Sequence, residues 1–98
     1  MPDERNRRGR MATERPERYA KQLAAHWARK ADTSQDGDRT VISFGGGEVV
    51  VLTACPGLLD ITVTVPAGAD ADRFAGVVAE HLQRFGTREE LAVTWDGA

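Results

Sequence analysis

The stretch from Ala69 to Trp95, ADADRFAGVVAEHLQRFGTREELAVTW, contains a helical pattern, a glycine and a strand pattern in succession. Its apolar positions recur at steps of three and four residues, as on the buried face of a helix, and they are Phe74, Val77, Val78, His81, Leu82 and Phe85. Asp70 or Asp72 can cap this helix, and Gly86 is placed to end it in the left-handed conformation. We expect a turn over residues 87–90 and then a strand ending at Trp95.

The clearest strand pattern precedes this helix. Leu59, Ile61, Val63 and Val65 alternate with polar residues until Pro66, which predicts an antiparallel sheet with one face covered. Two further strands are expected over residues 40–44 and 48–54. The glycines at 45–47 link them, and a strand follows instead of a helix, so we interpret them as a hairpin turn and not as a phosphate loop. Residues 32–38 are polar and rich in turn formers, and are expected to form a loop.

A first helix is expected to begin near Pro16, because proline suits the opening turn. Tyr19, Leu23, His26 and Trp27 lie on one face of it. Residues 1–10 offer almost nothing to bury, and we expect a disordered tail there, with Met11 as a candidate start and a short edge strand around residues 9–13. The expected order is (β)αβββαβ, an α+β two-layer sandwich over residues 11–98 with both helices on one face of a mainly antiparallel sheet.

Composition excludes several classes of protein. Hydrophobic residues make up 41% and charged residues 29% of the 98 positions, which is typical of one globular domain. The net charge of −2 gives no basis for general nucleic-acid binding. No apolar run is long enough for a membrane span, and the lone Cys55 suits a reducing cytoplasm. We therefore expect a cytoplasmic protein without nucleic-acid or membrane partners.

Each expected helix places one histidine on its apolar stripe, and His26 and His81 are the candidate chemical groups of the chain. If the helices pack side by side, both imidazoles can face one pocket. A metal would need further ligands, for which Cys55, Asp60 and Glu80 are candidates. The alternative is a pair of half-buried, hydrogen-bonded histidines, so the cofactor and metal stay unknown.

A catalytic role finds little support in the sequence. Histidine exchanges protons near neutral pH, but no Ser/His/Asp or Cys/His arrangement is legible. Trp27 and Trp95 are interpreted first as residues of the core or its rim, and only second as a stacking platform for a ligand. A binding or accessory role is therefore favoured over an enzyme.

Nearly the whole chain, from Met11 to Trp95, resembles a bacterial family known as domain of unknown function 2218. The resemblance lies in RYAKQLAAHW (18–27), GEVVVLTA (47–54) and HLQRFGTREELAVTW (81–95), the last being the most specific. It implies that His26 and His81 match histidines of the family pattern. It also implies a context of siderophore-iron utilisation, since members of the family are associated with it.

Two classes of function follow from these observations. The first is a small binding or accessory module for a small molecule or metal, linked to iron or siderophore utilisation. Its pocket would lie between the helices and would be lined by Tyr19, His26, Trp27, His81 and Phe85. The second is a homodimeric interaction protein without a small-molecule ligand, which would use an edge strand or the outer sheet face with its threonines at 62, 64 and 94.

Overall fold

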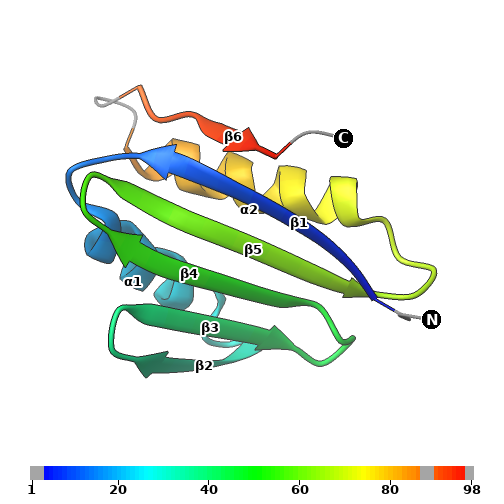
Figure 1. Ribbon diagram of the computed structural model, residues 1–98. Helices are drawn as coiled ribbons and strands as arrows, with labels where there is room; N and C mark the ends of the chain where they lie inside the picture. The colour runs from blue at the N-terminus through cyan, green and yellow to red at the C-terminus, as the bar shows by residue number, and fades with distance from the viewer. Residues whose placement is uncertain (1–3, 87–89, 97–98) are drawn as a thin grey trace.

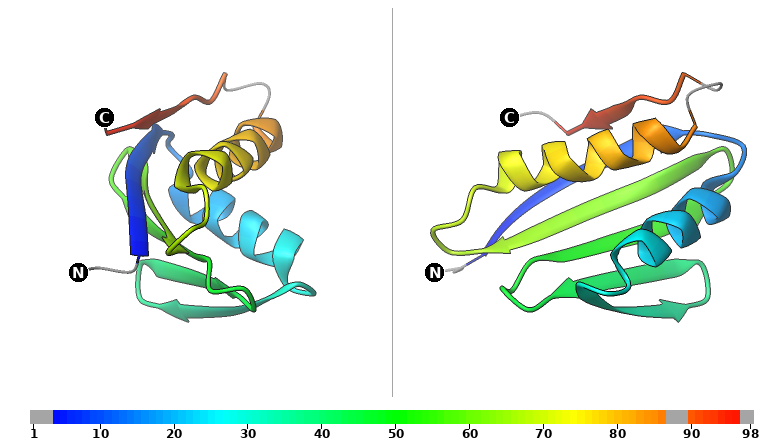
Figure 2. Two further views of the ribbon diagram at one scale, coloured as in Figure 1. Left: turned by 90° about the vertical axis from the view of Figure 1, so that its right-hand side faces the viewer. Right: turned by 180° about the vertical axis from the view of Figure 1, so that it is seen from behind.

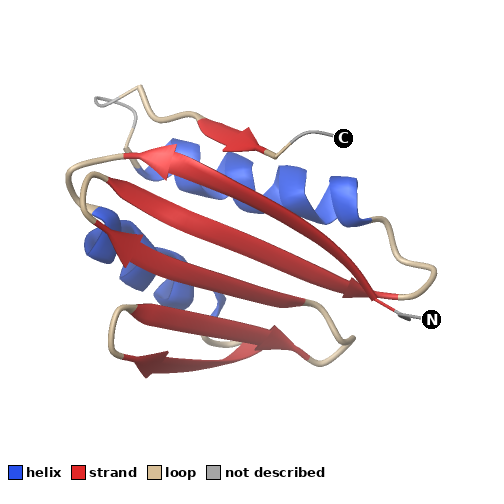
Figure 3. Cartoon of the chain, viewed as in Figure 1, coloured by secondary structure: helices blue, strands red, loops and turns tan. Residues whose placement is uncertain are grey.

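The computed structural model describes residues 4–86 and 90–96 (Figure 1). Its elements, drawn by type in Figure 3, are β1 (Glu4–Ala12), α1 (Pro16–Trp27), β2 (Ala31–Asp36), β3 (Arg39–Phe44), β4 (Val49–Cys55), β5 (Leu58–Pro66), α2 (Ala71–Phe85) and β6 (Val93–Trp95). The six strands form one sheet in the order β2-β3-β4-β5-β1-β6. Every pairing in it is antiparallel.

Both helices lie on the same face of this sheet, as the two side views in Figure 2 show. The fold is therefore a two-layer α+β sandwich, and the expected class is confirmed. We call the other face, which looks toward the viewer in Figure 1, the outer face. Neither helix covers it.

The strict alternation in β5 decides which face is buried. Leu59, Ile61 and Val63 are fully buried under the helices, because successive residues of a strand point to opposite faces. Buried residues of β1, β3, β4 and both helices complete one core, which includes Met11, Leu23, Ile42, Leu52 and Leu82.

Local signals explain where the helices begin. Pro16 occupies the first turn of α1, where the missing N–H costs nothing. The Asp70 side chain accepts a hydrogen bond from the Arg73 N–H at 3.1 Å and caps α2. The conformation expected of Gly86 is wrong, because its φ of −126° lies outside the left-handed region. Glycine is needed there for space, since a Cβ would lie 2.6 Å from the Tyr19 hydroxyl.

The expected disordered tail over residues 1–10 is wrong from Glu4 onward, and residues 1–3 lie outside the described part. Strand β1 begins at Glu4 and lies inside the sheet between β5 and β6, so it is also no edge strand. Three of its arginines form ion pairs instead of contacting only water. Arg7 contacts Asp72 of α2, Arg8 lies 3.5 Å from Asp60, and Arg10 lies 2.7 Å from Asp96. These carboxylates are distant in the sequence, which hides the pairing from local patterns.

The loop expected over residues 32–38 is also wrong, because Ala31–Asp36 forms the edge strand β2. All of β2 pairs with β3, and the two strands are joined by a tight turn at Gly37 and Asp38. Gly37 has a φ of 60°, which glycine adopts without steric cost. The observed order thus has one more strand than (β)αβββαβ.

The turn expected over residues 87–90 lies outside the described residues as far as position 89. In the part that the structure describes, neither α1 nor α2 has the length and apolarity that crossing a bilayer requires.

Candidate ligand site between the two helices

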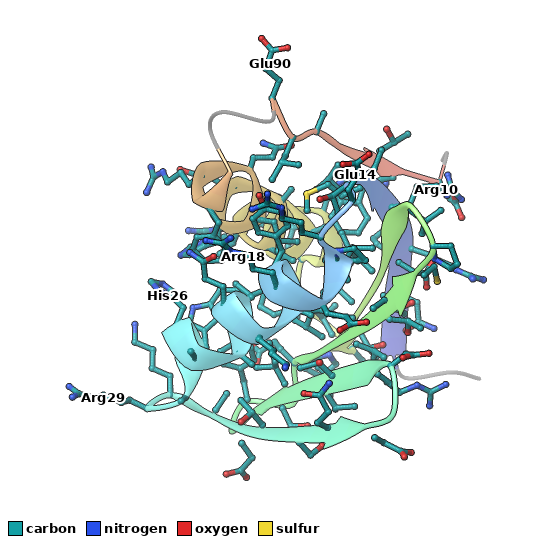
Figure 4. All side chains as sticks on the ribbon, turned by 90° about the vertical axis from the view of Figure 1, so that its left-hand side faces the viewer. Arg10, Glu14, Arg18, His26, Arg29 and Glu90 are labelled. Atoms are coloured by element: carbon teal, nitrogen blue, oxygen red, sulfur yellow. The ribbon has the colours of Figure 1, made fainter. Side chains whose placement is uncertain are left out.

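The two histidines meet between the helices. His26 lies in the last turn of α1 and is exposed, while His81 lies on α2 and is half-buried. Their ring centroids are 4.8 Å apart, with the ring planes inclined by 56°. Figure 4 shows His26 at the surface on the helical side of the molecule. Two positions far apart in the sequence therefore form one polar pair at the surface.

The histidine pair belongs to a row of neighbouring rings. The Phe85 centroid lies 6.1 Å from His26, and the Trp27 centroid lies 5.1 Å from His81. The centroids of Trp27 and Phe44 lie 5.2 Å apart, and those of Phe44 and Phe74 lie 5.7 Å apart. Both pairs of rings pack edge to face. Such spacings are typical of favourable aromatic contacts. We call these six residues the ring row, and it runs from α2 across α1 to β3 and back to α2.

A backbone contact fixes the orientation of the His81 ring. Its Nδ1 lies 2.7 Å from the carbonyl oxygen of Val77, one turn earlier in α2. Because a carbonyl oxygen only accepts, Nδ1 is the protonated nitrogen. In the neutral ring, Nε2 therefore keeps its lone pair. The same arrangement orients histidines that bind metal ions in proteins.

The five residues expected to line the pocket divide into two groups. His26, Trp27, His81 and Phe85 are joined by the ring contacts of the ring row. Tyr19 is 4% exposed and packs in the core against Gly86. Tyr19 of α1 therefore contributes to the packing against the end of α2.

The three candidate third ligands do not complete a metal site. Asp60 stands opposite Thr53 and Arg10 on the outer face, so the sheet separates it from the histidines. Cys55 lines a hollow of about 350 Å³ with Glu14 and Pro16, at the opposite end of α1 from His26. Glu80 is bound to Arg84 at 2.9 Å. Among the described residues, no three His, Cys, Asp or Glu side chains form a group that could hold a metal ion.

Basic residues flank the histidine pair. Arg18 stands two turns before His26, and positions eight apart lie on one side of a helix. Arg29 follows in the turn after α1 and, like Arg18, is exposed (Figure 4). On α2, Arg73 and Arg84 share the side of His81 at spacings of eight and three. Of these four arginines, Arg84 alone has an ion-pair partner within residues 4–86 and 90–96.

A second hollow adjoins this region along α2. Its volume is about 280 Å³, and its lining includes Phe74, Val77 and Arg73. Phe74 ends the ring row, and the Val77 carbonyl holds His81. Val77 itself is 38% exposed, the large apolar side chain left open among the described residues. The histidine pair and this hollow therefore lie along the same side of α2.

Sequence reasoning missed two parts of this region. Phe44 joins the row from β3, and no local pattern links a strand residue to a helical tryptophan. The Val77 carbonyl was also missed, although the four-residue spacing to His81 is the signal that could have found it.

Comparisons with known proteins agree with this fold. A solved structure described as the NMR structure of PA4090 from Pseudomonas aeruginosa is 31% identical to this chain, with a TM-score of 0.72. The similarity covers 95% of this chain and 96% of that one. No curated protein matches the chain. The family model described as "Uncharacterized protein conserved in bacteria (DUF2218)" matches residues 8–96, and the chain therefore belongs to the DUF2218 family.

Proposed function

We propose that this protein is a small binding module that takes an anionic metal chelate between α1 and α2, with His26 and His81 as its contacts to the metal. The observation that supports this most is the hydrogen bond from His81 Nδ1 to the Val77 carbonyl, beside the His26 ring. It leaves a nitrogen lone pair of His81 free for a ligand next to a second, exposed imidazole.

The spacing of the two rings suits one metal ion. Imidazoles that bind a metal at about 2.1 Å and at angles of about 90–109° have centroids about 4.5–5.2 Å apart. The observed distance is 4.8 Å. Because the described residues offer no third ligand, the remaining coordination positions belong to the chelator. An iron–siderophore complex that leaves two coordination positions open, in the context that the family resemblance implies, is a ligand of this kind.

The surroundings of the pair favour an anionic chelate with flat rings. Arg18, Arg29 and Arg73 have no ion-pair partner within the described ranges, so they can meet a negative ligand. The partly buried Phe85 ring lies 6.1 Å from His26, so a planar aromatic chelator can gain from stacking on it. Trp27 is 6% exposed and packs in the core against His81.

Titration of the full chain tests this function. The probes are ferric citrate, the ferric complex of 2,3-dihydroxybenzoate, the free chelators and haem. Trp27 lies 5.1 Å from His81, so a bound ferric complex should quench its fluorescence. A Trp95→Phe background isolates the signal of Trp27. We expect tighter binding of one ferric complex than of its free chelator.

Substitutions of the histidines locate the site. His26→Ala and His81→Ala should each weaken binding about tenfold or more, and the double variant should abolish it. Lys21→Ala, on an exposed position of α1 away from the pair, is the matched control and should bind normally. The proposal fails if no ferric complex binds, or if the double variant binds as the unsubstituted chain does.

A second candidate function is a homodimeric interaction protein without a small-molecule ligand. The observation that favours it is the outer face, which includes Thr62, Thr64 and Thr94 and is covered by neither helix. Light scattering at high protein concentration tests it, and a monomeric mass would contradict it.

A further inference from the structure

The outer face is organised in straight rows across the sheet. Directly opposed residues of antiparallel strands point to the same face. The strand register gives a first row of Asp36, Arg39, Thr53, Asp60, Arg10 and Thr94. A second row contains Ser34, Val41, Val51, Thr62 and Arg8, and its apolar part lies on β3 and β4. Val49 continues the apolar part beside Val51 on β4.

Charges alternate along the first row. Reading across the strands, the row has a negative, a positive, a neutral, a negative, a positive and a neutral side chain. Arg39 is exposed and has no ion-pair partner among the described residues. Asp60 has one weak contact, with Arg8 at 3.5 Å. The row therefore has unused charge of both signs.

We propose that a second copy of this chain docks on the outer face, about a two-fold axis parallel to β4. Such an axis brings the two sheets face to face, with β3 of one copy opposite β5 of the other and β2 opposite β1. Each row of one copy then faces the same row of the other. Arg39 on β3 then meets Asp60 on β5 of the second copy, and Asp36 on β2 meets Arg10 on β1. Each of these pairs occurs twice, as in any two-fold interface.

The same axis places the apolar part at the centre. Val51 meets Val51 and Val49 meets Val49 of the second copy, while Val41 meets Thr62. Sheets that pack face to face in this aligned way form β-sandwiches about 10 Å apart. Apolar side chains at the centre and charged pairs toward the edges are typical of protein interfaces.

Several other two-fold axes in this face bring like charges together. An axis along β3 opposes Arg39 to itself, and one along β5 opposes Asp60 to itself. An axis between β4 and β5 opposes Arg39 to Arg10, and one between β3 and β4 opposes Asp36 to Asp60. An axis across the strands through Val51 opposes Asp36 to Asp32 on β2. Axes between β5 and β1 or between β2 and β3 oppose Asp60 to Arg10 or Asp36 to Arg39, but they leave part of the sheet uncovered. The β4 axis is the arrangement that sets all four charged residues of the first row against opposite charges.

The size and chemistry of the face suit this partner. Neighbouring strands lie about 4.8 Å apart, and residues on the same face of one strand lie about 6.7 Å apart. The outer face of each copy therefore has a flat area of about 500 Å². Two copies then reach roughly 1,000 Å², the lower limit for a specific interface. The described rows contain no aromatic ring, so the face lacks the stacking platforms that single-stranded nucleic acid needs.

Mass measurement with charge reversal tests the pairing. At high concentration the full chain should sediment at about 21 kDa, twice its 10.7 kDa. Arg39→Glu should raise the dissociation constant of the dimer about 100-fold, because each substitution sets two new pairs of like charges against each other. Asp60→Arg should do the same, and the double variant Arg39→Glu/Asp60→Arg should recover the dimer.

Lys21→Glu, an equal change of charge on α1, is the control and should leave the mass unchanged. Circular dichroism of each variant separates dissociation from unfolding. This inference is independent of the histidine site and deepens the second candidate function. A monomeric unsubstituted chain overturns both the pairing and that function. A dimer that survives Arg39→Glu, or a double variant that stays monomeric, overturns the pairing alone.

Discussion

The two faces of the sheet place different demands on neighbouring residues of the same strand. On the covered face Ile61 is fully buried among apolar side chains, and its neighbour Thr62 stands half-exposed between Val51 and Arg8 on the outer face. The covered face holds the helices, and thus the histidine pair, in place. The outer face contributes less to the stability of the monomer, which leaves its sequence free for binding. Substitutions on the two faces should therefore differ in kind as well as in size.

The largest expected effect lies in the centre of the covered face. Ile61→Ala removes a fully buried side chain and should lower the free energy of unfolding by about 3–4 kcal/mol. Thr62→Ala, one residue away, should change it by less than about 0.5 kcal/mol. Urea denaturation followed by circular dichroism measures both. Equal losses at the two positions would contradict the division between the faces.

The next largest effect concerns the contact of β1 with β6. A Cβ on Gly9 would lie 2.7 Å from the Trp95 ring and 2.7 Å from the Thr94 carbonyl oxygen. Gly9→Ala should therefore cost about 1–3 kcal/mol and shift the fluorescence of Trp95. Gly76→Ala is the matched control, because no atom lies within 4 Å of its added methyl group. This exposed helical position should gain about 0.5–1 kcal/mol, and a loss there would show that the backbone of α2 is constrained.

A smaller effect is expected at the start of α2, which holds His81. Asp70→Ala removes the cap on the Arg73 N–H and should cost about 1 kcal/mol in thermal unfolding. Asp70→Asn keeps an acceptor oxygen and should retain most of the stability. An equal loss in both variants would mean that the charge at the helix start matters more than the hydrogen bond.

The smallest expected effect is a gain in the free energy of unfolding, from a substitution on the covered face. Thr40 on β3 is 3% exposed, and its hydroxyl has no hydrogen-bond partner among the described residues. Thr40→Val replaces that hydroxyl with a methyl group and should add about 0.5–1 kcal/mol. Chemical denaturation measures the change, and a loss would indicate that the hydroxyl binds an ordered water.

Much of the fold follows from local patterns. The alternation around Ile61 and the stripe from Phe74 to Phe85 were sufficient to predict β5, α2 and the sandwich. The sequence did not predict strand β2, because five of its six residues are exposed and show no buried alternation. Backbone pairing with β3 holds this strand in the sheet. The full extent of strand β1 was not predicted because three of its arginines pair with Asp60, Asp72 and Asp96, which only the folded chain brings near.

The candidate site was predictable to the same extent. Helical spacing placed His26 and His81 on stripes that could meet, and the rings are in contact. The exclusion of Asp60 and Cys55 as partners depends on sheet register and on the direction of α1, which no local pattern specifies. The alternation of charge across the outer face also depends on register, because its charged residues come from four different strands.

The position of β1 also has a consequence for how the chain folds. Strands β2 to β5 follow one another and pair through short connections, but β1 pairs Gly9 with Trp95 at the other end of the chain. Closing such long loops costs entropy before the contacts reward it, which slows folding. During synthesis β1 is made first, and it has no strand to pair with until β5 and then β6 have been made. Until then its unpaired backbone is open to neighbouring chains, so conditions that delay the last strand should favour exchange of β1 between molecules.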